Sequence, residues 1–397
     1  MVFNQKQGIL LKVEMKILFL SFNMAFHGGA TFYRALNIGT RLAKRGHEVI
    51  LMASSGQHKM HFYQRAIDQL TLVEAPGIMP TRWRHGYDFY EALKRSHWVA
   101  QRHFDLVHAF DSRPTVIYPA LAAKRGGSFL AMDWCDWFGR GGAVEERTNP
   151  VLRILLNKPE TFYEEAFRHE AELNTVINSQ LFQRAQGLGL SLEKIYLLRN
   201  GSDTQRIGLI QKKAARSELG LPEQAPILGY MGALFKADGD LLDGVIQNVR
   251  QVYPATRLVL IGNTKTSFPE NQHNLKTGFV NEKQVNLYLC ACDILLIPQT
   301  DTIANRGRWP SKINDYIAAG RPIAVTNVGD AANVVKKEEI GIVTAAGSIE
   351  FASGVIDLLR QPAGMEEMGK KARLLAEGKY NWDSIVQDLE AQYLRLM

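Results

Sequence analysis

A lysine and an aspartate three residues apart are the side chains of this sequence best suited to hold an anion and a sugar. They are Lys312 and Asp315, within "RWPSKINDYIAAGRPIAVTN", residues 308–327. Pro310 suits the first position of a helix, so Ser311 and Lys312 would lie in a first turn where free N–H groups favour a phosphate. Asp315, on the same face, could accept two hydroxyls of a ribose. The alternative is a surface pair worth roughly 0.2–0.5 kcal/mol to the helix.

Two further acids, Asp133 and Asp136, stand in "AMDWCDWFGRGGAVEER", residues 131–147. They follow an apolar run, and acids at the carboxyl end of a strand can contact sugar hydroxyls or act as a base. Capping of the next turn is the alternative, and a metal-binding pair is a third. We assign no metal to these acids or to the Asp-Gly-Asp segment at 238–240.

The paired glycines Gly28 and Gly29 fall between the first expected strand and its helix. Glycine there lets the backbone approach a ligand whose anion would meet the N–H groups of the helix start, although a tight connection explains it equally well. The dinucleotide fingerprint G-x-G-x-x-G is missing, which disfavours a nicotinamide enzyme. His108 ends a buried strand, where we expect a core histidine with a backbone partner rather than a group facing a cleft.

These residues need a scaffold of parallel strands, and the hydrophobic pattern predicts one. Short apolar runs alternate with helical periodicity, which is typical of sheets covered by helices on both faces. We expect a first series of strands at 15–22, 47–53, 70–76, 106–110, 128–134, 174–179 and 194–201, and a second at 227–232, 256–262, 293–299, 321–327 and 341–346. The fold class is therefore α/β, with two Rossmann-like, doubly wound parallel-sheet domains facing a cleft.

Composition limits the classes of partner. The 397 residues carry a net charge of +7 and three cysteines without metal-site spacing. No apolar run reaches the length of a membrane span, and no secretory signal is evident, so we expect a cytoplasmic protein. Residues 81–103 interleave cations with aromatic residues, which predicts either an ordinary amphipathic helix or one lying on an anionic membrane surface, with the protein peripheral on the inner face. Nucleic acid is disfavoured because no binding motif accompanies the charge.

Several segments together resemble a known family. They are GGATFYRALNIGTRLAKRGHEVILM, TVINSQLF, KIYLLRNGSD, GYMGALFKADGDLLDGVI, LVLIG, TGFV, ACDILLIPQ and PSKINDYIAAGRPIAVTN. In order and spacing they are similar to the retaining glycosyltransferases of family 4 (glycosyl transferases group 1), which have the GT-B fold. The resemblance implies an acceptor domain at 15–203 and a nucleotide-sugar donor domain at 204–378. It leaves 1–14 as an extension and 379–397 as a C-terminal helix that packs back on the first domain.

The resemblance also implies roles for individual residues. The ribose-binding acid of the family falls on Asp315, but its partner in the E-x7-E pair falls on Gly307. The family's phosphate-binding arginine and lysine fall on Ala233 and Ala237. Lys236 is one place off, and the cations left to neutralise the diphosphate are Arg306, Arg308 and Lys312. We expect Lys312, Asp133 and Asp136 to be catalytic. The expected donor-binding residues are Gly28, Gly29, Lys236, Phe279, Val280, Arg308, Ser311 and Asp315.

The function implied is transfer of a sugar, with retention, from a nucleotide-sugar to a hydroxyl of a cell-surface glycan or a lipid-linked acceptor. The dominant chemical requirement is fixed positive charge at the departing diphosphate, so we expect no cofactor and no required metal. Two alternatives remain open. A nucleotide-sugar epimerase would share the GT-B fold, and a non-catalytic sugar-nucleotide-binding subunit would fit the loss of the glutamate at Gly307.

Overall fold

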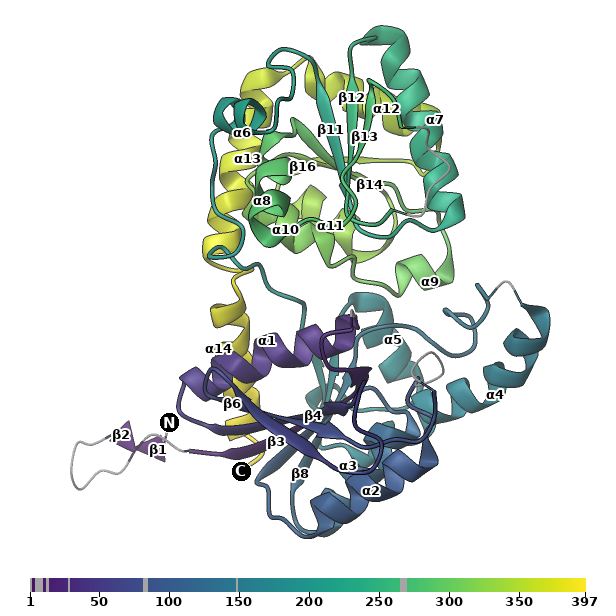
Figure 1. Cartoon of the computed structure of the whole chain (residues 1–397), viewed down its shortest axis with the longest axis vertical. Helices are drawn as coiled ribbons and strands as arrows, with labels where there is room; N and C mark the ends of the chain where they lie inside the picture. Colours follow the sequence, from purple (N-terminus) through teal and green to yellow (C-terminus); the bar gives the residue numbers. More distant parts are fainter. Residues whose placement is uncertain are drawn as a thin grey trace. The chain divides into compact units, whose positions relative to one another are not determined.

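The computed structural model describes residues 2–3, 10–11, 14–27, 29–80, 85–147, 149–264 and 270–397. The chain forms two compact units (Figure 1). The first contains residues up to Arg199 together with Ile385–Met397, and the second contains Asn200–Ser384. The boundary at Asn200 lies four residues before the one expected from the sequence. Gly28, which we expected at the donor site, lies outside the described residues.

The first unit is built on an eight-stranded sheet in the order β10-β9-β8-β7-β3-β4-β6-β5. The parallel strands are β3 (Lys16–Met24), β4 (Glu48–Ser54), β6 (Leu70–Ala75), β7 (Leu106–Phe110), β8 (Phe129–Trp134), β9 (Leu173–Val176) and β10 (Ile195–Leu197). The edge strand β5 (Tyr63–Ile67) is antiparallel to β6. A separate antiparallel pair, β1 (Val2–Phe3) and β2 (Leu10–Leu11), falls within the segment for which the sequence predicted no structure.

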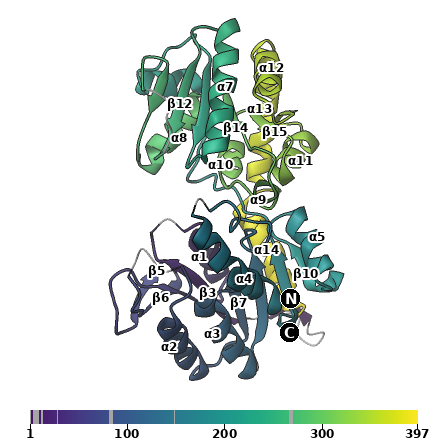
Figure 2. The same cartoon turned by 90° about the vertical axis from the view of Figure 1, so that its right-hand side faces the viewer.

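Helices cover both faces of this sheet, because alternate residues of each buried strand point to opposite sides. The helix α1 (Ala30–Lys44) packs on one face, and α2 (Phe89–Ala100) and α3 (Pro114–Arg125) pack on the other (Figure 2). Leu18, Leu20 and Val107 belong to the core on the α3 side. The unit also contains α4 (Pro150–Ala166), α5 (Ser179–Gly187) and the 3-10 turns Arg168–Glu170 and Leu192–Lys194.

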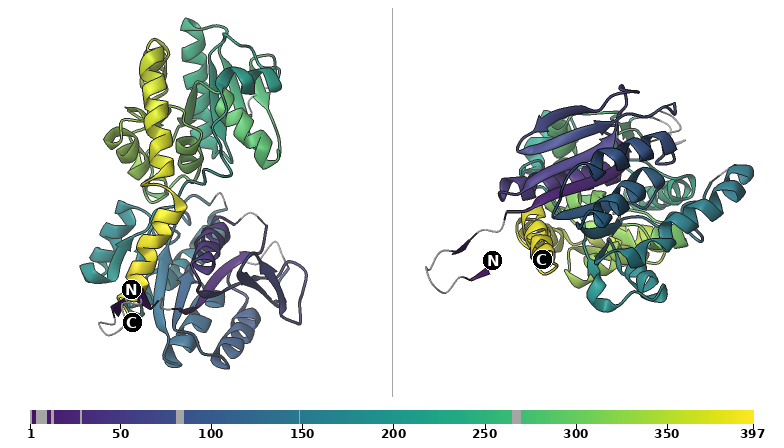
Figure 3. Two further views of the ribbon diagram at one scale, coloured as in Figure 1. Left: turned by 90° about the vertical axis from the view of Figure 1, so that its left-hand side faces the viewer. Right: turned by 90° about the horizontal axis from the view of Figure 1, so that it is seen from below.

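The last helix, α14 (Trp382–Leu394), belongs to the first unit from Ile385 onward (Figure 3). Two of its side chains bond to the sheet region of that unit. The hydroxyl of Tyr393 lies 2.5 Å from Nδ1 of His108, and Glu390 lies 2.7 Å from Nε2 of His47. His108 is therefore a core residue, but its partners are side chains rather than the expected backbone group, and burial lowers its pKa to about 3.

The second unit is built on a six-stranded parallel sheet in the order β13-β12-β11-β14-β15-β16. Its strands are β11 (Ile227–Met231), β12 (Arg257–Ile261), β13 (Asn274–Lys276), β14 (Ile294–Ile297), β15 (Ile323–Thr326) and β16 (Gly341–Thr344). Its helices are α6 (Lys212–Glu218), α7 (Lys236–Val252), α8 (Glu282–Ala291), α9 (Ile303–Arg306), α10 (Lys312–Ala318), α11 (Gly329–Lys337), α12 (Ser348–Leu359) and α13 (Pro362–Glu377). One face of the sheet forms a core with α7 and α12.

The basic and aromatic segment at 81–103 is helical only in part. Residues 81–84 lie outside the described part, and α2 begins only at Phe89. Arg95 is fully buried and forms an ion pair with Glu91 at 2.5 Å, while Trp98 is 8% exposed. The side of α2 that carries Arg95 and Trp98 therefore packs against the first unit, as in an ordinary amphipathic helix, while Phe89 and Leu93 are exposed. Within the described residues, none of the helices combines the length and apolar composition that crossing a bilayer requires.

Candidate functional site

The centre of the candidate site is Lys312, the first residue of α10, in the second unit. Its ammonium group donates to the hydroxyl of Tyr230 at the end of β11 and lies 3.7 Å from the centroid of that ring. Burial lowers the pKa of Lys312 to about 7, although the negative charge of Asp238 raises it in part. The carboxyl ends of parallel strands are where ligands of such sheets bind, so the cation stands at the expected place.

Asp238 influences Lys312 without forming an ion pair with it in the part of the chain that the structure describes. Its Oδ1 accepts hydrogen bonds of 2.8 Å from both the backbone N–H and the hydroxyl of Thr300, and one from Asn305. This carboxylate therefore ties the first turn of α7 to the loop after β14. Lys312 thus has a hydroxyl and an aromatic ring as its immediate partners, which leaves its positive charge incompletely neutralised.

The start of α10 differs from the sequence-based expectation. The helix has seven residues and begins at Lys312, so Pro310 precedes it by two residues and Ser311 is the N-cap. The N–H groups of Ile313 and Asn314 already donate to the carbonyl oxygens of Pro310 and Ser311. These amides are consequently not open to a phosphate, and the charge of Lys312 is the main attraction that this segment offers to one.

Asp315 lies one turn further along α10 and pairs with Arg206. The alternative of a surface Lys312–Asp315 pair is therefore wrong, since each side chain has a different partner. Asp315 is 15% exposed at its side chain, and burial raises its pKa to about 6, because Arg206 only partly offsets the burial and the nearby charge of Asp203. A ribose that bound Asp315 would have to share the carboxylate with Arg206 or displace it.

Three further cations that we expected near a diphosphate, Arg308, Arg306 and Lys236, differ from one another in exposure and in their partners. Arg308 lies over the ring of the exposed Phe235, with its guanidinium carbon 4.6 Å from the centroid, and donates to Asn305. Arg306 and Lys236 are exposed, and each forms a short ion pair, with Asp301 and Asp240 respectively. Arg308 is thus the cation of these three that is held beside an open aromatic surface.

Asp240 points to Lys236 on the surface, whereas Asp238 is buried, so the two acids of the Asp-Gly-Asp segment do not converge. Among the described residues, no group of histidine, cysteine and acidic side chains is arranged to hold a metal ion.

The backbone near the carboxyl ends of the strands in the same unit is accessible at two places. Gly232, directly after β11, has a φ of +92°, which glycine adopts without strain, and a Cβ built there would meet nothing within 4 Å. Phe279, in the loop between β13 and α8, is 89% exposed and follows Gly278, which also has a positive φ. Val280 beside it is half-buried. Phe279 and Val280, both expected to bind the donor, therefore lie on an accessible segment.

The two candidate acids of the first unit, Asp133 and Asp136, accept hydrogen bonds from groups of the protein itself. Asp133 is fully buried, and the guanidinium of Arg34 donates to both of its oxygens at 2.9 Å, with Thr175 donating at 2.6 Å. Burial alone would raise the pKa of Asp133, but the charge of Arg34 holds it below its usual value. The expected contact of Asp133 with sugar hydroxyls is thus corrected, because its oxygens are enclosed and bonded by protein groups. Asp136 is half-buried and accepts the N–H of Trp137.

Gly29 is the residue before α1, and the structure gives it a packing role. A Cβ there would lie 2.2 Å from the side chain of Asn23, whose oxygen accepts the N–H of Phe32 in the first turn of the helix. A tight strand-to-helix connection is enough to explain this glycine.

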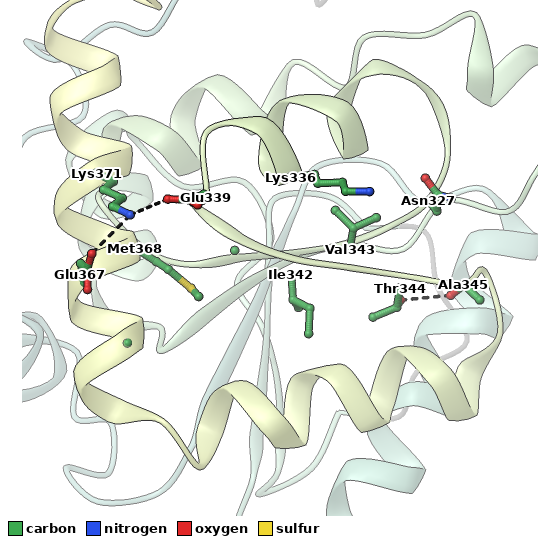
Figure 4. Close-up of a pocket in the computed structure, with 12 residues that line it drawn as sticks. Asn327, Lys336, Glu339, Ile342, Val343, Thr344, Ala345, Glu367, Met368 and Lys371 are labelled. Carbon is green, nitrogen blue, oxygen red and sulfur yellow. Dashed lines mark hydrogen bonds and ion pairs between the residues drawn. The ribbon is translucent and has the colours of Figure 1, made fainter.

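The hollow shown in Figure 4 lies elsewhere in the second unit, along the edge strand β16. Its volume is about 680 Å³, and none of the residues predicted to bind a ligand lines it. Lys371 in its wall forms ion pairs with Glu339 and Glu367. Lys371 is therefore neutralised, in contrast to Lys312.

Sequence reasoning missed the partners that define these groups: Arg206, Tyr230, Asp238 and Arg34. Asp238 belongs to the Asp-Gly-Asp segment, but its bond to Thr300 spans 62 residues. Nothing local in the sequence signals such pairings.

Two family models match the chain. "Glycosyltransferase Family 4" matches residues 28–206, and "Glycosyl transferases group 1" matches residues 225–361. A relative, spore coat protein SA of Bacillus subtilis (strain 168), is 24% identical over 198 residues, which are 46% of this chain and 52% of that protein. The chain thus covers about half the length of the curated relative that it matches.

Solved structures with a similar fold cover nearly all of the chain. Sucrose-phosphate synthase from Thermosynechococcus elongatus has a TM-score of 0.74 and 15% identity, and the similarity covers 96% of this chain and 99% of that one. HepE from Anabaena, solved in complex with UDP and glucose, has a TM-score of 0.69 and 15% identity over 97% of this chain and 100% of that one. At such identities the similarity establishes the fold, namely two Rossmann-like units of the GT-B type.

Proposed function

Because this chain belongs to the group 1 glycosyltransferases with the GT-B fold, we propose that it transfers a sugar, with retention, from a nucleotide-sugar to an acceptor hydroxyl. The acceptor that we propose is a cell-surface glycan or a lipid-linked precursor. The observation that carries the proposal is the half-buried ammonium of Lys312, which stands at the carboxyl end of β11 with a lowered pKa. A cation held in this way is stabilised by an anionic ligand.

In the proposed reaction, the bond between the anomeric carbon and the phosphate oxygen breaks as the acceptor oxygen forms its own bond to that carbon. The acceptor proton passes to the departing phosphate, so no side-chain nucleophile is needed. Negative charge grows on the diphosphate as it leaves, and Lys312 stabilises that charge most in the transition state. Arg308 supplies a second cation, and the chemistry then needs no resident metal.

A nucleotide as the carrier of the sugar is supported by the structural neighbours. HepE was solved in complex with UDP and, in another crystal, with UDP-glucose. In this chain the ribose would meet Asp315 and the base would meet the loop of Phe279. Which base and which sugar are bound is a question for the experiment below, since Gly307 replaces the carboxylate that the family holds near the donor sugar.

The proposal is tested by incubating the purified protein with a panel of UDP-, GDP-, ADP- and dTDP-sugars. We expect one donor to release free nucleotide slowly by hydrolysis, and the Lys312→Ala variant to lose that release. Formation of an epimer would instead indicate the epimerase, and binding without turnover would indicate the non-catalytic subunit that the loss of the glutamate at Gly307 favours.

The proposed ribose contact has its own test. Replacing Asp315 with Ala should weaken nucleotide binding by about 1.5–3 kcal/mol, because two hydroxyls lose a charged acceptor. Calorimetry with the nucleoside diphosphate measures this loss. Asp301→Ala is the matched control, since Asp301 is an exposed acid of the same unit that is paired with an arginine. Unchanged affinity in the Asp315 variant would remove the assignment.

A further inference from the structure

The helix α4 of the first unit buries polar side chains and exposes apolar ones, which is the reverse of an ordinary surface helix. Its only fully buried side chains are those of Glu160 and Glu164, among the residues that the structure describes. Its aliphatic residues face outward instead: Val151 is 61% exposed, Leu152 47%, Ile154 73% and Leu155 64%. A surface helix normally buries its apolar stripe, so these exposed side chains need another explanation.

The buried glutamates show why the helix has this orientation. Glu160 forms an ion pair with Arg147 at 2.6 Å, and Glu164 forms one with Arg184 at 3.0 Å. Glu164 also accepts hydrogen bonds from Trp134 and from the backbone of Phe138 and Gly139. The polar side of α4 is thereby fixed against the unit, which leaves the apolar side outward. Figure 1 shows the course of this helix in the first unit.

The exposed face is continuous along the helix. Val151, Leu155, Lys158 and Phe162 follow one another at intervals of four, three and four residues, so they lie on one side. Phe162 is 54% exposed and packs edge-on against Tyr163. The hydroxyl of Tyr163 bonds to that of Tyr118, which is also exposed, and this adds amphipathic aromatic groups to the end of the stripe.

The charge of this face selects the kind of partner. Lys158 is the exposed cation of this face, and the first ten residues, 150–159, contain no acid. An apolar stripe that carries a cation and no acid complements a bilayer that contains anionic lipid. A second copy of the chain fits less well, because a two-fold contact through this stripe would bring the Lys158 side chains of both copies together.

We propose that α4 is a membrane-docking helix, which inserts Val151, Ile154 and Leu155 among the acyl chains of an anionic bilayer while Lys158 meets the phosphates. This inference does not depend on sugar transfer. It also moves the membrane contact from residues 81–103, where the sequence had suggested it, to residues 150–162.

Sedimentation of the full chain with vesicles tests the docking. We expect binding to vesicles of phosphatidylglycerol and phosphatidylcholine to exceed binding to pure phosphatidylcholine, and to decrease as salt is raised. The double variant Ile154→Glu with Leu155→Glu should bind at least tenfold more weakly. Leu93→Glu is the matched control, because Leu93 is 69% exposed on α2 of the same unit, and it should bind like the natural chain.

Each other result overturns the proposal. Equal binding by the double variant, or an equal loss in Leu93→Glu, would show that α4 is not the contact. Absence of vesicle binding in the natural chain would exclude membrane docking directly. If analytical ultracentrifugation shows a dimer that the double variant abolishes, the face joins two copies instead. An unchanged thermal unfolding curve for the variant verifies that it folds, and Lys158→Glu should remove most of the salt dependence.

Discussion

Two aspartate–arginine pairs of this protein show how differently the same chemistry can be used. In the first unit, Asp133 is enclosed by Arg34 and Thr175, and its pKa lies below the usual value. In the second unit, Asp315 pairs with Arg206, yet its pKa rises to about 6. Asp133 is fully buried and Asp315 is largely buried, but only for Asp133 does the charge of the partner arginine outweigh the effect of burial on the pKa. The enclosed pair fits a structural role for Asp133, whereas Asp315 keeps a carboxylate that a ligand could reach.

Lys312 extends the contrast. Arg34 is fully buried and has an ionised partner, so its pKa stays raised, whereas Lys312 has only a tyrosine and a more distant carboxylate, and its pKa falls to about 7. In the first unit, Asp133 and Arg34 therefore form a closed pair. In the second unit a cation and an acid near the same strand ends are both shifted towards their neutral forms, which is typical of binding sites before the ligand arrives.

The largest effect should come from breaking the closed pair. Asp133→Ala leaves the Arg34 guanidinium buried without its anion, so we expect a loss of about 3–5 kcal/mol in the free energy of unfolding. Urea unfolding followed by circular dichroism measures it, and Asp240→Ala, which removes an exposed pair, should change stability far less. A stable Asp133→Ala variant without turnover would reverse the comparison and make Asp133 catalytic.

Removal of the incompletely neutralised cation should affect chemistry more than folding. For Lys312→Ala we expect kcat to fall about 10²–10³-fold, because charge on the leaving diphosphate is largest in the transition state. Nucleotide affinity should fall by a smaller factor, and the Tm should change little. Steady-state kinetics and calorimetry on the same preparation compare the two losses. Equal factors would mean that the lysine binds the ground state only.

The pH dependence of nucleotide binding tests whether Lys312 becomes charged when the diphosphate binds. A bound diphosphate favours charged Lys312, so the pKa of this lysine rises in the complex, and above pH 7 binding must take up a proton. Nucleotide affinity should therefore decrease as the pH rises above 7, with a slope approaching tenfold per pH unit. Calorimetry between pH 7.5 and 9 measures it. Lys312→Arg should show almost no slope, because its side chain stays charged, and a slope equal to that of the natural chain would contradict the assignment.

The smallest effect is expected for Lys236. This lysine is 88% exposed and already pairs with Asp240, so its charge is screened by solvent and neutralised by its neighbour. Lys236→Ala should change nucleotide affinity by less than about twofold. A large loss would show that the lysine leaves Asp240 to meet the phosphate, and the contrast with Lys312 would then disappear.

Local sequence patterns determined most of the architecture. Parallel strands buried on both faces read as continuous apolar runs, and for this reason β7 was predicted with its correct bounds at residues 106–110. The short strands β5 and β13 were missed. The exposed edge strand β5, Tyr63–Ile67, consists mostly of exposed residues, so no apolar run marks it. The candidate cation Lys312 was also found from the sequence, because Pro310 marks the start of a helix just before it.

The sequence by itself determined the positions of the polar residues relative to the strands and helices, namely at the ends of particular strands and at the start of α10. It could do so because hydrophobic periodicity is a local property of the chain. Only the tertiary structure decided which of these groups are neutralised. Asp133 meets an arginine 99 residues away, Asp315 meets one 109 residues away, and Lys312 meets a tyrosine at a distance of 82 residues along the chain. The physical reason is that a charge removed from water is stabilised by whatever the packing brings beside it, and no local pattern specifies that neighbour.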